Sequence, residues 1–415
     1  MSNNRKKKPI SFNKQEAAHY KKIYFQKIIE VAKAVSLNDS YKLLTPDMLE
    51  TIFSIRSRLF KIVAPDCLNL NSGELQEMKE AIVLHLKSNG IQFESTGHEL
   101  LLYDFAGPGL SLFTYLAIRK NESKKKAELV AAFEDFIDTT ELLVNLQEYI
   151  YKITNQIGCE LTRFDKWILS PTVSFKVVKV PSPYMYIEIT LKVHQPETIS
   201  LNINGNTRPV FRVGITSDGS EVFWSYINAE ILGVSHLAPG TQIPVYIQHH
   251  AINRLKERID CADNTMVLLN LVNSLNEAKC IIYHGNKLIE FIFSNQKIGY
   301  LLIDLVNDIA VIRTFLMLTH FDTPEGDVFH KLIGLEKLDI SYLTLDKLST
   351  FVFSEIKESD MIADLFSQSG CKSLLDVPKK EFGKEEYKFK AAAIETYLLK
   401  YQEYKEQFNF ENLFS

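Results

Sequence analysis

The spacing of apolar residues predicts helices over roughly the first 160 residues. Residues 14–35 repeat apolar side chains every three or four positions, after Asn13 and Glu16, which together resemble a capping box. Thr45-Pro46-Asp47 combines a cap, a proline at the first helical position and an early acid, so a helix over 46–60 is expected. Two more helices are expected in the rest of this domain, from Ser72 to the stop at Asn89-Gly90 and over 124–154, ending at Gly158.

These helices predict a helical domain over residues 1–160. After it, the spacing of apolar residues changes to the alternation typical of strands. Runs rich in β-branched and aromatic residues cover 172–180, 184–193, 199–203, 210–215 and 221–227. Turn signals separate them, at Pro181-Ser182-Pro183, Asn204-Gly205 and Asp218-Gly219. An antiparallel sheet or small barrel is therefore expected over 161–242.

A third pattern of predicted helices and strands begins at residue 243. A short strand over 244–248 leads into a helix over 250–259, and Asn264 is expected to cap a second helix over 265–279. Four strands with short polar turns between them follow, over 280–284, 287–293, 298–306 and 309–318. The expected module, 243–322, is two helices followed by a four-stranded meander. Thr323-Pro324-Glu325 then opens a helical region, 323–415, which makes the chain an α+β multidomain protein.

Composition restricts the classes of partner. The chain is 46% hydrophobic and 24% charged, with a formal net charge of −4, so no overall basic field attracts nucleic acid or membranes. The five cysteines are widely spaced without a CxxC pair, which argues against a disulfide framework or a thiolate zinc site. No stretch approaches the about 20 apolar residues of a membrane span. A cytoplasmic protein without a membrane partner is expected.

Helix 250–259 carries the candidate chemistry. At about 100° per residue, His250, Arg254 and Arg258 fall on one arc with Glu257, opposite the apolar residues of the same helix. Arginines hold a phosphate in a bidentate fork, and a histidine can move a proton near neutral pH. The same face also fits an ordinary solvated surface with ion pairs at helical spacing, and spacing alone favours that interpretation.

The pattern His250-Ala251-x-x-Arg254-x-x-x-Arg258, followed by a helix and a four-stranded meander, resembles BrnT-type toxins. These belong to the broad barnase–RelE–colicin group of metal-independent ribonuclease folds. The resemblance implies that this helix packs on a curved antiparallel sheet and that His250, Arg254 and Arg258 are catalytic. It implies RNA as the partner and no cofactor or metal ion.

The resemblance also implies that a polar residue on the last strand completes the site. That strand, 309–318, offers Arg313 and Thr314, which simple alternation places on opposite faces. Both faces are otherwise apolar. We favour Thr314, because a short hydroxyl fits a helix-covered face better than a long cation does, and Arg313 stays open.

Two functions follow. The first is a metal-independent RNA-cleaving or RNA-binding protein, to which the basic runs 5–8 and 124–126 lend weak support. The second is a structural or interaction protein in which the ribonuclease-like module is catalytically silent. Long amphipathic patterns over 124–154 and 385–408 suit the second, through a protein partner or a homo-oligomer.

Overall fold

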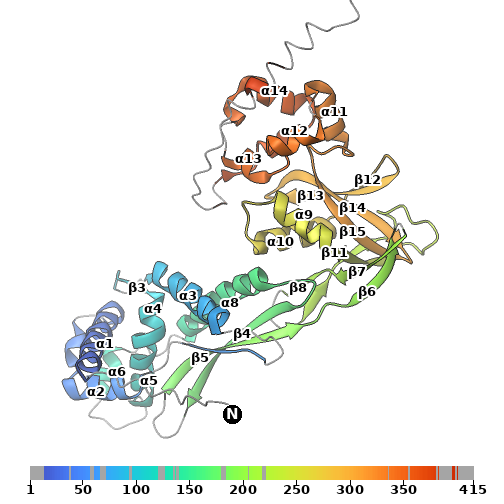
Figure 1. Ribbon diagram of the computed structural model, residues 1–415. Helices are drawn as coiled ribbons and strands as arrows, with labels where there is room; N and C mark the ends of the chain where they lie inside the picture. The colour runs from blue at the N-terminus through green and yellow to red at the C-terminus, as the bar shows by residue number, and fades with distance from the viewer. Residues whose placement is uncertain are drawn as a thin grey trace, which may run out of the picture. The chain divides into compact units, whose positions relative to one another are not determined.

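The computed structural model shows a mixed α+β protein with several sheets (Figure 1). It describes residues 14–36, 39–56, 60–65, 72–92, 96–119, 127–133, 136, 140–178, 184–203, 205–216, 221–334, 336–353, 356–379, 382, 395–397 and 400. The two basic runs and most of the predicted helix 385–408 lie outside these residues. The chain divides into two compact units, Met1–Ile157 with Pro171–Lys192, and Gly158–Ser170 with Val193–Ser415.

The first unit is mostly helical. Its helices include α1 (Lys14–Val35), α2 (Pro46–Ser54), α3 (Ser72–Ser88), α4 (Leu102–Asp104), α5 (Leu110–Arg119), α6 (Ala127–Ala132) and most of α8 (Thr140–Leu161). Its strands are β1 (Phe60–Val63), β2 (Gly90–Gln92), β3 (Glu99–Leu101) and much of β4 (Ile168–Val178) and β5 (Tyr184–His194). The strands form a sheet of order β1-β5-β4 and a separate β2-β3 pair.

The helix starts were predicted better than the helix ends. Thr45 caps α2 by accepting a hydrogen bond from the backbone N–H of Met48, as predicted. The helix ends at Ser54, however, and a strand starts at Phe60, so the helix predicted over 46–60 was too long. Gly158 was wrongly predicted to stop a helix, because α8 continues through it to Leu161. A mid-helix glycine costs only about 1 kcal/mol, which tertiary packing can outweigh.

The second unit is built on a large sheet of order β12-β13-β14-β15-β11-β7-β6, with β10 also paired to β11 (Figure 1). Its strands are β6 (Thr198–Ile203), β7 (Asn206–Arg212), β10 (Tyr226–Asn228), β11 (Gln242–Gln248), β12 (Cys280–Tyr283), β13 (Asn286–Phe293), β14 (Gln296–Val306) and β15 (Ile309–Met317). A short pair, β8 (Gly214–Thr216) and β9 (Val222–Trp224), forms a separate two-stranded sheet. The β12–β15 meander is antiparallel, whereas β11 joins β15 in parallel. Strands from residues 198–212 therefore extend the same sheet as the meander.

Three tight turns connect the meander, at the positions that the sequence predicted. Both central residues have positive φ in His284-Gly285, Ser294-Asn295 and Asn307-Asp308. Two-residue hairpins prefer this conformation, because its twist matches that of the flanking strands. The polar and glycine residues at these positions therefore set the register of all four strands.

Two helices pack on this sheet, α9 (His249–Arg258) against β15 and α10 (Asn264–Asn276) against β13. The apolar side of α9, with Ala251 and Leu255 almost fully buried, enters the main core of the unit. Burying a leucine contributes about 1.5–3 kcal/mol, so this side fixes which way the polar side of α9 faces.

Asn264 does not cap α10 as predicted. The cap is Asp263, whose carboxylate accepts a hydrogen bond of 2.7 Å from the Met266 N–H. The Asn264 side chain instead donates to the carbonyls of Cys159 and Thr162 near the end of α8. An amide can donate to a helix C-terminus, whereas a carboxylate cannot, which explains why these neighbours take different roles.

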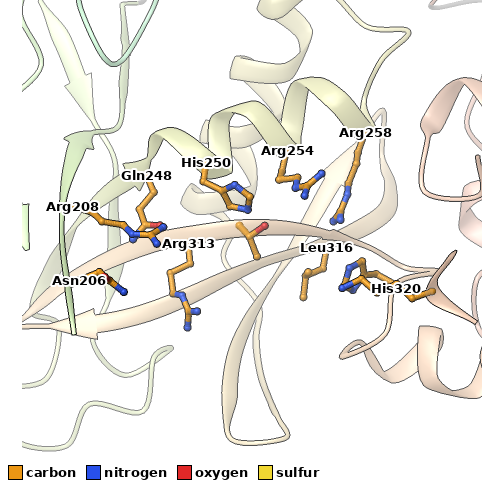
Figure 2. Close-up of a pocket in the computed structure, with 11 residues that line it drawn as sticks. Asn206, Arg208, Gln248, His250, Arg254, Arg258, Arg313, Leu316 and His320 are labelled. Carbon is orange, nitrogen blue, oxygen red and sulfur yellow. The ribbon is translucent and has the colours of Figure 1, made fainter. Parts of the chain in front are cut away.

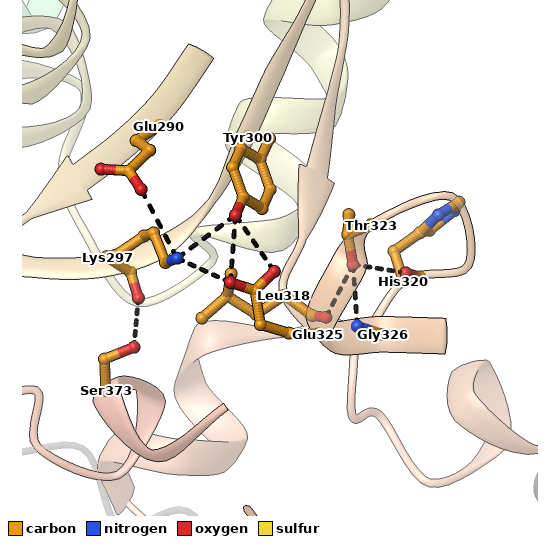
Figure 3. Close-up of polar contacts among 9 residues, drawn as sticks. All are labelled: Glu290, Lys297, Tyr300, Leu318, His320, Thr323, Glu325, Gly326 and Ser373. Atoms are coloured by element: carbon orange, nitrogen blue, oxygen red, sulfur yellow. Dashed lines mark hydrogen bonds and ion pairs between the residues drawn. The ribbon is translucent and has the colours of Figure 1, made fainter. Parts of the chain in front are cut away.

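The C-terminal part of this unit is helical, with α11 (Pro324–Ile333), α12 (Lys337–Tyr342), α13 (Leu348–Phe353) and α14 (Asp360–Gln368). Thr323 caps α11 by accepting a bond from the Gly326 N–H, which confirms the predicted helix start. Glu325 of α11 accepts bonds from Lys297 (2.6 Å) and Tyr300 (3.0 Å) of β14, which ties this helix to the sheet (Figure 3). In the described part of the chain, every helix is too short or too polar to span a membrane.

Candidate functional site

The polar side of α9 opens onto a pocket of about 370 Å³ in the second unit (Figure 2). It is enclosed by strands β7, β11 and β15, by the segment after β15, by helix α9 and by the start of α12. Its lining consists of Asn206, Arg208, Gln248, His250, Arg254, Arg258, Arg313, Thr314, Leu316, His320 and Lys337.

All four residues predicted for the site line this one pocket: His250, Arg254, Arg258 and Thr314. Arg313 lines it as well, although alternation along the strand predicted opposite faces for Arg313 and Thr314. The reason is a register shift in the β14–β15 pairing, where Thr314 pairs with Leu302 and Ile312 with Ile303. Arg313 is the extra residue of this β-bulge, and a bulge interrupts the alternation of side chains.

Arg258 is the most buried cation of the pocket, at 6% exposure. One of its terminal nitrogens donates to the Phe315 carbonyl, and its Nε has no hydrogen-bond partner. Among the described residues no carboxylate forms an ion pair with it, and burial lowers the pKa of its guanidinium. A buried charge is normally paired, because desolvating it costs several kcal/mol. The remaining donors of Arg258 therefore suit an anion in the pocket.

The other three arginines of the pocket differ in whether an acidic side chain pairs with their charge. Arg254 pairs with Glu257 at 2.5 Å on the same helix, which is the ion pair that the solvated-face interpretation expected. Arg313 pairs with Asp304 of β14 at 3.3 Å. Arg208 of β7 has no ion pair within the described residues. Arg208 is exposed, unlike Arg258, so water solvates its charge and leaves it accessible to a ligand.

Two imidazoles line the pocket and both are held toward the neutral form. Burial lowers the pKa of His250, and Arg254, Arg208 and Arg258 lower it further. Burial and the charge of Arg258 lower the pKa of His320 to about 4. A neutral imidazole can accept a proton, and a bound phosphate would raise both pKa values again.

Sequence reasoning missed five polar lining residues: Asn206, Arg208, Gln248, His320 and Lys337. Most come from segments far from the motif helix, and no spacing rule connects them to it. Gln248 is the exception, because it directly precedes α9, and only 5% of it is exposed. His320 lies three residues beyond the last strand, so a search for polar residues just past the end of β15 would have found it.

The pocket suits an anion and does not suit a metal ion. Of the eleven described lining residues, five are arginine or lysine, two are histidine and none is acidic. Within the described residues there is also no group of three histidine, cysteine or acidic side chains that could hold a metal. Arginine forks match phosphate or carboxylate oxygens and repel cations.

The geometry therefore defines a cationic pocket with two imidazoles and one hydroxyl, which can bind a phosphate and move protons near it. Comparisons of the chain with protein-family models, with curated proteins and with solved structures find no match.

Proposed function

We propose that residues 243–322 form a ribonuclease-toxin-like module whose pocket binds an RNA phosphodiester and cleaves it without a metal ion. The observation that carries this proposal is Arg258, a buried cation with no acidic partner among the described residues, in one pocket with His250. A guanidinium that is only 6% exposed and forms no ion pair with a described residue lowers the stability of the fold. Binding an anion restores the missing interactions.

The proposed roles follow from the chemistry of each group. Arg258 and Arg254 donate to the non-bridging oxygens of the scissile phosphate and stabilise the extra charge of the pentavalent transition state. His250 transfers a proton to or from a reacting oxygen. The Thr314 hydroxyl donates a further hydrogen bond to a phosphate oxygen.

The size and charge of the pocket favour a single strand. At about 370 Å³ it lies toward the small end of ligand sites, which run from about 300 to 1,000 Å³. One nucleotide with its phosphate fits such a space. Arg208 and Lys337 supply charge for the neighbouring phosphates, so binding should weaken steeply as salt increases.

The test is cleavage of total RNA by the full chain in EDTA. We expect His250→Ala and Arg254→Ala each to lose about 10²-fold or more in rate, which is the typical contribution of one proton-transfer or charge-stabilising group. Two neighbours on the same helix, which do not line the pocket, provide matched controls. His249→Ala removes an adjacent imidazole and Lys256→Ala an equal charge, and both should cleave like wild type.

Intact RNA with the wild-type protein would contradict the enzymatic role. If the wild type then still bound RNA, with Arg258→Leu abolishing that binding, the pocket would belong to a silent, RNA-binding module. Equal loss in the His249 and His250 variants would show a general effect on the helix and remove the assignment of the site.

A further inference from the structure

His320 occupies a place in the pocket that the proposed function leaves without a role. Figure 2 shows the two arginines of α9, Arg254 and Arg258, between His250 on one side and His320 on the other. In-line displacement at phosphorus needs the attacking and leaving oxygens on opposite sides of the phosphate. A phosphate held by the two guanidiniums therefore presents one reacting oxygen toward each histidine.

The His320 ring is held in a defined orientation. Its Nδ1 bonds to the Phe321 carbonyl, and since a carbonyl only accepts, Nδ1 carries the proton. The Phe321 ring stacks on His330 with centroids 3.4 Å apart, and His330 Nε2 bonds to the Thr319 carbonyl at 3.1 Å. With the proton on Nδ1, Nε2 of His320 is the proton acceptor when the ring is neutral.

Burial and the charges around His320 keep its ring neutral at pH 7. Arg258 of α9 and Lys337 of α12 disfavour a positive imidazole, and the nearby Asp322 opposes them. Burial has the largest effect and also lowers the pKa. A neutral, oriented imidazole beside buried guanidiniums is the state that a general base requires at the start of the reaction.

We propose that His320 is the second proton-transfer residue of the site, and that its Nε2 removes the proton from the ribose 2′-hydroxyl. This inference rests on the proposed function. As the proton moves to Nε2, the O2′–P bond forms. His250, protonated beside the bound phosphate, gives its proton to O5′ as the P–O5′ bond breaks. The products are a 2′,3′-cyclic phosphate and a 5′-hydroxyl, and no oxidant or further reactant is needed.

The experiment compares two substrates of the full chain, a uridylyl-adenosine dinucleotide and uridine 3′-(p-nitrophenyl phosphate). The p-nitrophenolate leaves without protonation, so the second substrate does not need a general acid. We expect His320→Ala and His320→Gln to lose about 10²–10⁴-fold in kcat/KM on both substrates. His250→Ala should lose a similar factor on the dinucleotide and little on the aryl ester.

Two further readouts separate catalysis from structure. Inorganic phosphate should bind to both His320 variants within about threefold of wild type, because the arginines remain. The decline of wild-type kcat/KM at acid pH should disappear in the variants, since it reports protonation of the free base. His284→Ala, which removes an exposed histidine outside the pocket, is the matched control.

Each alternative result contradicts either the role of His320 or the proposed function. His320 variants that cleave both substrates like wild type, while His250→Ala fails on the dinucleotide, would remove the role of His320 and leave the proposed function standing. Rescue of the His320 variants by the aryl ester would make His320 an acid and overturn its assignment as the base. A wild type that cleaves neither substrate would overturn the proposed function, and this inference with it.

Discussion

Two cations in the second unit, the buried Arg258 and the half-buried Lys297, differ in their charged neighbours. Lys297 lies 2.6 Å from Glu325 and 3.6 Å from Glu290, and its ammonium also bonds to the Tyr300 hydroxyl (Figure 3). Arg258 is more buried, yet no carboxylate of the described residues pairs with it (Figure 2). Acidic side chains of the fold pair with Lys297, whereas the proposed function assigns the charge of Arg258 to a bound phosphate.

The pKa values of Lys297 and Arg258 shift in opposite directions, in line with this difference in ion pairing. Burial acts to lower the pKa of Lys297, but the hydrogen bond and charge of Glu325 outweigh it, so the pKa is raised. Burial has the largest effect on Arg258 and lowers its pKa, although the charges of Asp346 and Glu257 act to raise it. A buried charge without an ion pair is a candidate binding group, whereas a charge that is paired within the fold contributes to structure.

The largest effect is expected for Arg258→Leu, which removes the uncompensated charge. RNA cleavage should fall by about 10²–10³-fold, the usual cost of losing one charge-stabilising donor. The free energy of unfolding should stay within about 1 kcal/mol of wild type or increase, because leucine removes an unpaired buried charge. Cleavage rates and denaturant unfolding test both parts, with Lys256→Leu as the control. A large loss of stability with unchanged cleavage would show that Arg258 is structural.

The pH dependence of stability gives the next effect. His320 has a folded pKa of about 4, below the unfolded value of about 6.5. The unfolded chain therefore binds the proton more readily between these values, and stability declines as pH falls through this window. The contribution is present above pH about 6.5 and reaches about 3 kcal/mol by linkage. Unfolding free energies at several pH values should show a smaller decline in His320→Leu than in wild type. Identical slopes would contradict this account.

A smaller effect on activity, with a clear effect on stability, is expected for Lys297→Met. The change leaves Glu325 and Glu290 without their cation, which should cost about 1–3 kcal/mol, since these groups are partly exposed and water screens them. Cleavage per folded molecule and phosphate affinity should remain within about threefold of wild type. Denaturant unfolding and phosphate titration measure the two quantities. If Lys297→Met lost phosphate binding, Lys297 would not be a purely structural cation, and the contrast with Arg258 would be wrong.

Sequence reasoning located the motif helix and the meander well, because both depend on local patterns. The apolar positions of α9, the three turns with positive φ and the Thr323 cap all follow from the preferences of neighbouring residues. It failed where two residues compete for one role. Asp263 caps α10 in place of Asn264, because the amide of Asn264 donates to the Cys159 carbonyl, about 100 residues earlier in the chain.

The sequence by itself determined that His250, Arg254 and Arg258 share one side of a helix, because the helical period alone brings them together. Only the tertiary structure decided that this side lines a pocket, that Arg258 is buried there without an ion pair to any described carboxylate, and that Arg208 and His320 join it. The bulge at Arg313 was likewise decided by strand pairing. The physical reason is that burial and ion pairing depend on contacts between distant segments, whereas helical spacing depends only on neighbours in the chain.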